Sequence, residues 1–113
     1  MGYEQDYIKR LLQKVGEVLA RALGVGKGGN YDESLQILEQ GIGSELGMPF
    51  AMLLRLEPKA LVSLLGPVKA SAFAQALRTR ATLFGLARRD ADSKLSAARA
   101  ETIEALLAPP RPT

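Results

Sequence analysis

Arginine is the residue type in this chain best suited to binding chemistry, and it gathers in the second half of the sequence. The basic residues concerned are Arg78, Arg80, Arg88, Arg89, Lys94 and Arg99. Arg78 and Arg89 are eleven positions apart, close to three helical turns, so one helix would carry both on the same face. Because guanidinium groups bind carboxylates and phosphates, this cluster predicts a docking patch for an acidic peptide or a nucleic acid. The alternative is a solvated face that is partly neutralised by nearby acidic residues: Asp90, Asp92, Glu101 and Glu104.

Two further patterns could hold an ion. The segment 24–29 is rich in glycine and contains Lys27, but no strand pattern precedes it and no Ser or Thr follows the lysine, as a phosphate-binding loop requires. We interpret it as a linker between helices. The acidic pairs Asp32/Glu33 and Asp90/Asp92 supply too few oxygen ligands for a calcium loop, and helix capping explains both. We therefore expect no metal site and no cofactor.

The composition excludes most catalytic chemistry. The 113 residues include no histidine and no cysteine. Histidine is the commonest general base, and cysteine supplies thiolate nucleophiles and zinc ligands. An enzyme would have to rely on carboxylates, lysine or tyrosine, and no isolated acidic residue stands out on an apolar face. We expect a noncatalytic protein.

Charge is distributed unevenly along the chain. Residues 1–57 carry six Lys/Arg and eight Asp/Glu, whereas residues 58–113 carry nine Lys/Arg and four Asp/Glu. The net charge of the whole chain is +3. This polarity could support head-to-tail contacts between copies or an acidic partner. We find no apolar run long enough to span a bilayer and no apolar signal core at the N-terminus. The expectation is a cytoplasmic protein with no membrane association.

The first half of the chain predicts a pair of helices. Apolar residues spaced by three and four predict an amphipathic helix over 7–23, with Gly24 as its left-handed terminator. A second helix should begin after the capping box formed by Asn30 and Glu33 and should end at Gly47. Gly41 and Gly43 interrupt this helix, and we attribute them to close backbone approach to a neighbouring helix.

The second half predicts two short helices and two long ones. The short helices, 49–56 and 58–65, each begin with proline, and their apolar residues include Leu53 and Leu54, which could be core or the wall of an apolar groove. A long helix over about 68–89 should bury the stripe Phe73, Ala74, Leu77, Ala81 and Phe84. A last helix to about residue 107, capped by Asp90, Asp92 or Ser93, should bury Leu95, Ala98, Thr102 and Leu106.

The expected fold class follows from these elements. No segment shows the strict alternation of a half-buried strand, so we predict an all-α protein of about six helices, two of them short. Residues 1–108 should form a single helical domain, and residues 109–113, which are rich in proline, should form a flexible tail.

The segment Gly29–Ile42 resembles the second helix of a tetratricopeptide repeat, with Ser34 and Gly41 at the two positions that the repeat reserves for small residues. The helix before it would be its partner. A second, fainter copy runs from Phe84 to Pro109 and places Ala97 and Glu104 at those positions. The chain is similar to small bacterial helical proteins with repeat-like pairs and no assigned activity. The resemblance implies stacked helix pairs and a protein-binding groove; an irregular helical bundle is the alternative.

These observations favour a noncatalytic protein–protein interaction module. It would bind a peptide or helix, or a second copy of itself as a homodimer, through an apolar groove with basic edges. The residues expected to contact the partner are Arg78, Arg80, Arg88, Arg89, Leu53 and Leu54. The alternative function is nucleic-acid binding through the arginine-rich C-terminal half.

Overall fold

Five helices follow one another in the part of the chain that the computed structural model describes, residues 2–109. They are α1 (Gly2–Lys27), α2 (Tyr31–Leu46), α3 (Phe50–Arg55), α4 (Pro58–Leu86) and α5 (Asp90–Leu107). No strand occurs among these residues, so the predicted all-α class is confirmed. Apart from Pro109, the predicted tail lies outside the described residues.

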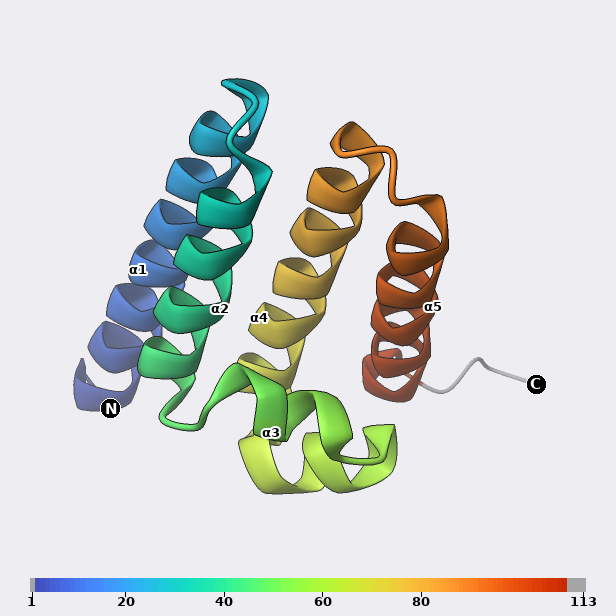
Figure 1. Cartoon of the computed structure of the whole chain (residues 1–113). Helices are drawn as coiled ribbons and strands as arrows, with labels where there is room; N and C mark the ends of the chain where they lie inside the picture. Colours follow the sequence, from blue (N-terminus) through green and yellow to red (C-terminus); the bar gives the residue numbers. More distant parts are fainter. Residues whose placement is uncertain (1, 110–113) are drawn as a thin grey trace.

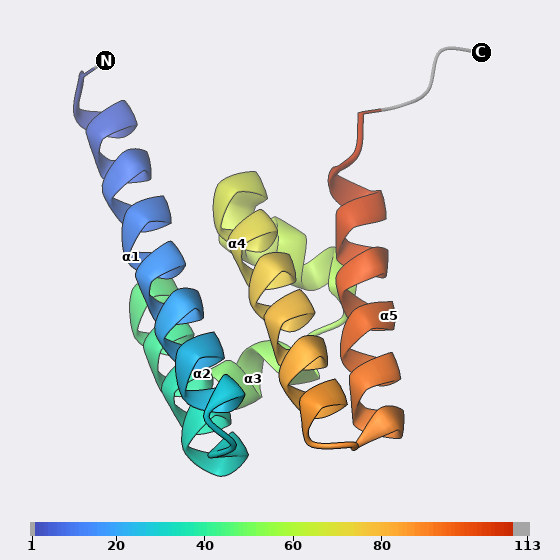
Figure 2. The same ribbon diagram turned by 90° about the horizontal axis from the view of Figure 1, so that it is seen from above.

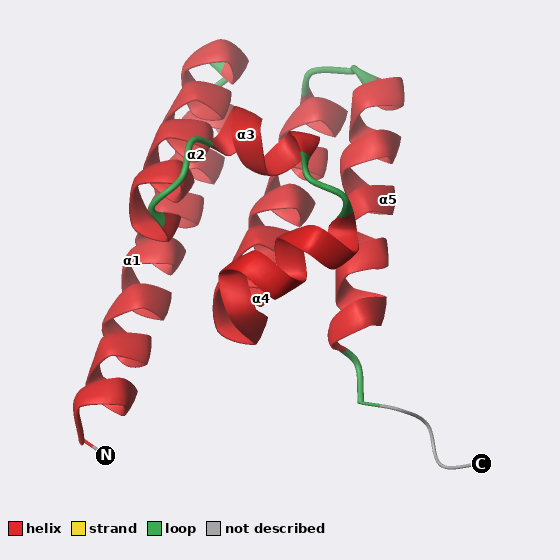
Figure 3. Ribbon diagram, turned by 90° about the horizontal axis from the view of Figure 1, so that it is seen from below, coloured by secondary structure: helices red, strands yellow, loops and turns green. Residues whose placement is uncertain are grey.

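The long helices form two antiparallel hairpins, α1 with α2 and α4 with α5. Figure 1 shows both hairpin turns at the same end of the molecule. At the other end, α3 and the first turns of α4 carry the chain across from one hairpin to the next (Figure 3). The hairpins meet where α4 packs against both α2 and α1.

A break at Gly66 explains why five helices replace the predicted six. The predicted helices 58–65 and 68–89 are both present, but they join into the single element α4. Gly66 has φ 81° and ψ 167°, a region that only glycine enters without strain, and the following Pro67 has no amide hydrogen to continue the ladder. The two segments of α4 therefore point in different directions.

The two hairpins are built on the same turn, repeated 59 positions later. The residue before α2, Asn30, has φ −95° and ψ 77°, and the residue before α5, Arg89, has φ −98° and ψ 72°. Each follows a residue of positive φ, Gly29 at 93° and Arg88 at 61°. The backbone hydrogen bonds match as well: the amides of Asn30 and Arg89 both donate to the carbonyl five residues earlier.

A serine clamps each hairpin just beyond its turn. Ser34 Oγ of α2 donates to the carbonyl of Ala22 in α1 at 2.5 Å, and Ser93 Oγ of α5 donates to the carbonyl of Ala81 in α4 at 2.8 Å. The two bonds are again 59 positions apart. The predicted second copy of the repeat therefore has the wrong alignment with the first. The residue equivalent to Ser34 is Ser93, whereas the prediction placed Ala97 at that position.

Small residues let the paired helices approach closely. A Cβ atom on Gly41 would lie 2.6 Å from Val18 Cγ1, so the prediction that this glycine faces a neighbouring helix is confirmed. Gly43 instead approaches the chain after α2, where a Cβ atom would lie 3.0 Å from the Met48 carbonyl oxygen. The position 59 residues after Gly41 is Ala100, which is fully buried.

The predicted ends of the first two helices are partly right. The Glu33 amide donates to Asn30 Oδ1 at 3.4 Å, which confirms the N-cap of α2, and Gly47 ends α2 with φ 81°. Gly24, however, does not end α1. That helix continues to Lys27, with Gly26 buried beside Leu83 and Ser34, and the left-handed residue is Gly29.

The apolar core is centred on α4. The predicted stripe of that helix is confirmed, since its five residues are all buried. By length and composition alone, α4 could also cross a membrane. This differs from the sequence prediction, which found no apolar run of sufficient length. A core helix passes the same test, and α4 packs against α1, α2 and α5.

The predicted core face of α5 is wrong. Leu95 is 70% exposed and Leu106 is 40% exposed, and Ala98 and Thr102 are exposed as well. The face that meets α4 instead carries small or short residues and one isoleucine: Ser96, Ala100 and Ile103. The predicted caps are also wrong, because Arg89 precedes α5 without a side-chain cap. Ser93 is used in the clamp to Ala81, and this bond fixes the rotation of α5 against α4.

Replacing Gly41 by alanine should separate α1 from α2. Its Cβ atom would meet the stiff branched side chain of Val18, so we expect Gly41→Ala to lower the free energy of unfolding by about 1–3 kcal/mol. The matched control is Gly24→Ala in α1, where nothing lies within 4 Å of the added atom. In a helical position that change should stabilise by about 0.5–1 kcal/mol. Denaturant unfolding measures both, and equal effects would contradict the packing described.

Candidate functional site

Three of the four predicted arginines form ion pairs within the chain. Arg78 pairs with Glu104, Arg80 with Glu39 and Arg89 with Asp92. Arg88 is exposed in the turn before α5. Arg80 and Arg89 meet at the Phe84 ring, but the arginines do not form one open basic patch, because each of the three is paired with a different carboxylate.

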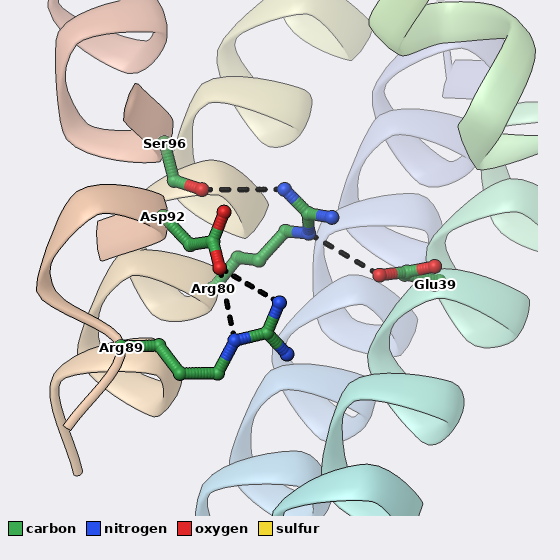
Figure 4. A network of polar contacts seen from close by, with 5 residues as sticks. All are labelled: Glu39, Arg80, Arg89, Asp92 and Ser96. Carbon is green, nitrogen blue, oxygen red and sulfur yellow. Dashed lines mark hydrogen bonds and ion pairs between the residues drawn. The ribbon is translucent and has the colours of Figure 1, made fainter. Parts of the chain in front are cut away.

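Arg80 lies between the two hairpins (Figure 4). Its Nε donates to Glu39 Oε2 of α2 at 3.2 Å, and its Nη1 donates to Ser96 Oγ of α5 at 3.3 Å. The guanidinium also lies over two buried rings, 4.7 Å from the centroid of Phe84 and 5.7 Å from that of Phe50. The side chain of Arg80 in α4 thus joins α2, α3 and α5, and its guanidinium is occupied by contacts within the protein.

Arg89 closes the α4–α5 turn. It donates to Asp92 Oδ2 from Nε at 2.9 Å, with Nη2 at 2.7 Å from the same oxygen (Figure 4). Its guanidinium lies 4.7 Å from the centroid of Phe84. The sequence assigned Phe84 only to the core. Its position between two arginines, four and five residues away, is the signal that could have indicated these contacts.

Arg78 and Glu104 form an exposed pair on the outside of the second hairpin. Arg78 Nη2 donates to Glu104 Oε1 at 2.6 Å, and Nε donates to Oε2 at 3.2 Å. The hydrogen bond from Arg78 holds the pKa of the Glu104 carboxyl below its ordinary value. A depressed carboxyl pKa contributes stability at neutral pH that is lost as the pH falls through it. Both side chains are nearly half exposed, so this contribution is small.

Arg99 has a structural contact that the sequence did not indicate. Its Nη2 donates to the Leu56 carbonyl and, at 3.4 Å, to the Leu53 carbonyl, which lie at the end of α3. Burial lowers the pKa of Arg99. The guanidinium thereby attaches the short helix α3 to α5.

The predicted leucines lie in and beside the core. Leu53 is completely buried, so it presents nothing to a partner at the surface. Leu54 is half-buried and packs against the core from its edge. The short helix α3 therefore contributes to the interior through Leu53 and Phe50.

An apolar groove lies between the first turns of α1 and the bend of α4. One hollow of about 390 Å³ is lined mainly by Tyr7, Ile8, Leu11, Leu65, Pro67 and Val68, with Glu4 and Lys69 as its charged residues. A second hollow of about 280 Å³ shares Ile8, Pro67 and Val68 and adds Leu12 and Ser71. We call these two hollows the α1/α4 groove.

Helix length explains why the α1/α4 groove is open. α1 has 26 residues and α2 has 16, so α1 extends past the end of its partner (Figure 2). Tyr7 of α1 is 57% exposed and Leu12 is 45% exposed. The sequence indicated the apolar residues of this helix, but it did not indicate that α2 would leave some of them uncovered.

A shallower depression of about 520 Å³ lies between α2 and α3. Its lining includes Glu39, Gly43, Met48, Pro49 and Phe50. Glu39 is already bound by Arg80, and Phe50 is buried in the core. This depression follows from the tight connection after α2.

Among the described residues, no group of three or more Asp, Glu, His or Cys side chains could hold a metal ion. The α1/α4 groove contains one carboxylate and one ammonium group on otherwise apolar walls. Comparison of the chain with family models, curated proteins and solved structures finds no match.

Arg80 and Arg78 should differ sharply in their effect on stability. We expect Arg80→Met to lower the free energy of unfolding by about 2–4 kcal/mol, because it removes the contacts to Glu39, Ser96 and Phe84. The control Arg78→Met removes only an exposed pair and should cost less than about 1 kcal/mol. Denaturant unfolding compares the two. An unchanged free energy of unfolding in Arg80→Met would contradict the structural role given to this arginine.

Proposed function

We propose that this chain is a noncatalytic protein–protein interaction module that binds the apolar face of an amphipathic helix in the α1/α4 groove. The observation that carries the proposal is the row of uncovered apolar side chains along this groove, from Tyr7 and Leu12 of α1 to Pro67 and Val68 of α4. Grooves between helices commonly accept such a face through apolar anchors at helical spacing.

The chemistry of the groove favours an apolar anchor over a charged one. Its charged residues, Glu4 and Lys69, are of opposite sign, so they give no net attraction to an acidic or basic ligand. Binding would come from burial of leucine-like side chains, each contributing about 1.5–3 kcal/mol. The expected basic edges are not part of this proposal, because the predicted arginines line neither hollow.

A two-hairpin architecture is consistent with this role. The turn, the serine clamp and the small residues recur 59 positions apart, which supports a repeat-like construction of stacked helix pairs. The proposal that the construction is of tetratricopeptide-repeat type rests on the resemblance of Gly29–Ile42. Ser34 and Gly41, its two small positions, both lie against α1.

Nucleic-acid binding, the alternative function, receives no support from a specific contact. Phosphate binding would use free Arg and Lys side chains, and Arg78, Arg80 and Arg89 are already paired with carboxylates. We therefore do not propose it.

The groove can be tested with a synthetic amphipathic helix. The probe is a peptide with leucines along one face and balanced Glu and Lys on the other, titrated into the labelled protein by NMR. Amide shifts should be centred on α1 near Ile8 and on α4 near Val68. The double variant Tyr7→Glu, Leu12→Glu should weaken binding about tenfold or more, since two anchor contacts are lost.

Met52→Glu is the matched control for this experiment. Met52 is 51% exposed, like Tyr7 and Leu12, but it lies on α3 outside the groove. Its replacement should leave the affinity unchanged. Shifts that avoid the groove, or equal losses in the double variant and in Met52→Glu, would contradict the proposal.

A further inference from the structure

The outer face of α5 carries an apolar stripe that no other segment of residues 2–109 covers. α5 lies at the edge of the molecule and packs against α4 (Figures 1 and 2). The face turned away from α4 is exposed along its length, and Leu95 on it is the most exposed large apolar residue described, at 70%. The exposed stripe consists of Ala91, Leu95, Ala98, Thr102 and Ala105.

The spacing of this stripe is that of a helix–helix seam. Its residues alternate steps of four and three, the repeat that keeps a seam facing a second helix. Thr102 suits such a seam because its hydroxyl already donates to the Ala98 carbonyl at 3.0 Å. Three alanines allow a second helix to approach closely. Leu95 is the single large side chain and can pack into the space beside an alanine.

The charges beside the stripe select the partner and its direction. Lys94 and Glu101 flank the same side of it, one on each side of Ala98 along the helix. Neither forms an ion pair in the part of the chain that the structure describes. If two copies of α5 pair antiparallel, Lys94 of each copy faces Glu101 of the other. Parallel pairing would instead bring Lys94 toward Arg99, a residue of the same sign.

We propose that two copies of this chain associate through an antiparallel pairing of their α5 helices. The two-fold axis produces two equivalent ion pairs, each between Lys94 of one copy and Glu101 of the other. Leu95 of each copy packs beside Ala98 of the other. An isologous interface of this kind uses the same patch on both partners and cannot grow further.

A third helix hairpin fits the same face less well. The residues 59 positions before Lys94 and Glu101 are Leu35 and Ile42, which are buried core residues of α2. Where α2 offers apolar side chains to its neighbours, α5 therefore offers an ammonium and a carboxylate group. These charges oppose continued stacking of hairpins, but they suit a copy that presents the opposite charge at each position.

The α1/α4 groove stays free in this dimer. Figure 2 shows α1 and α5 at opposite edges of the molecule, so pairing through α5 leaves α1 at the outer ends. A dimer would then present two grooves. The dimer does not depend on the groove binding a helix, and either could fail without the other.

The solution mass of the chain and of charge variants tests the pairing. Light scattering during size exclusion should give twice the chain mass of 12.1 kDa, and dilution should shift it toward the monomer. Lys94→Glu and Glu101→Lys should each weaken dimerisation about tenfold or more, because each places like charges together twice. An equimolar mixture of the two variants should regain the dimer, since every facing pair is then of opposite sign.

Matched controls separate the interface from general effects on charge and folding. Lys59→Glu changes the same charge at an exposed site on α4, and it should leave the dimer intact. Leu95→Glu should yield a monomer with unchanged helicity, whereas Met52→Glu should remain a dimer. A wild-type monomer at every soluble concentration would overturn the proposal. So would a dimer that survives Leu95→Glu, or variants that fail to recombine when mixed.

Discussion

Contact between helices at small residues, fixed by one serine hydrogen bond in each hairpin, is the constraint on which this structure depends. Ser34 binds the Ala22 carbonyl and Ser93 binds the Ala81 carbonyl, each just beyond a turn of the same backbone form. A hydroxyl reaches a main-chain carbonyl of another helix only when the two helices lie in close contact. The bond therefore sets both the separation of the helices and the rotation of the second helix about its axis.

The rotation of α5 determines which surface the molecule presents. With Ser93 turned toward α4, the residues about one, two and three turns later on that side are Ser96, Ala100 and Ile103. Leu95 is then forced to the outside. Arg80 adds a second restraint, because it binds Ser96 of α5 and Glu39 of α2 together. The polar contacts that join the hairpins and the apolar stripe that faces solvent are thus two results of the same arrangement.

The sequence predicted the elements better than the surfaces. Helix pairs, the Asn30 cap, Gly47 and the buried stripe of α4 follow from local spacing and backbone preference, which short segments carry by themselves. The inner face of α5 could not be predicted in this way. Alanine and serine give a weak apolar signal, so the larger Leu95 and Leu106 dominated the pattern although the serine clamp turns them outward.

The candidate sites depended even more on distant partners. The arginines lie close together in the sequence, but the carboxylate that binds Arg80 is Glu39, 41 positions earlier in the chain. The α1/α4 groove exists because α1 outreaches α2 and because Gly66 bends α4. The difference in helix length cannot be read from the residues that line the groove, whereas Gly66 and Pro67, which bend α4, are themselves part of its lining.

The most direct test of this account is the free energy of unfolding of Ser34→Ala and Ser93→Ala, alone and together. Each change removes one clamp and leaves the helix propensity equal or better. The account predicts a loss of about 0.5–1.5 kcal/mol for each serine and a nearly additive loss for the double variant, since the two hydroxyls bind different carbonyls. Unchanged stability in either single variant would contradict the claim that the same clamp holds both hairpins.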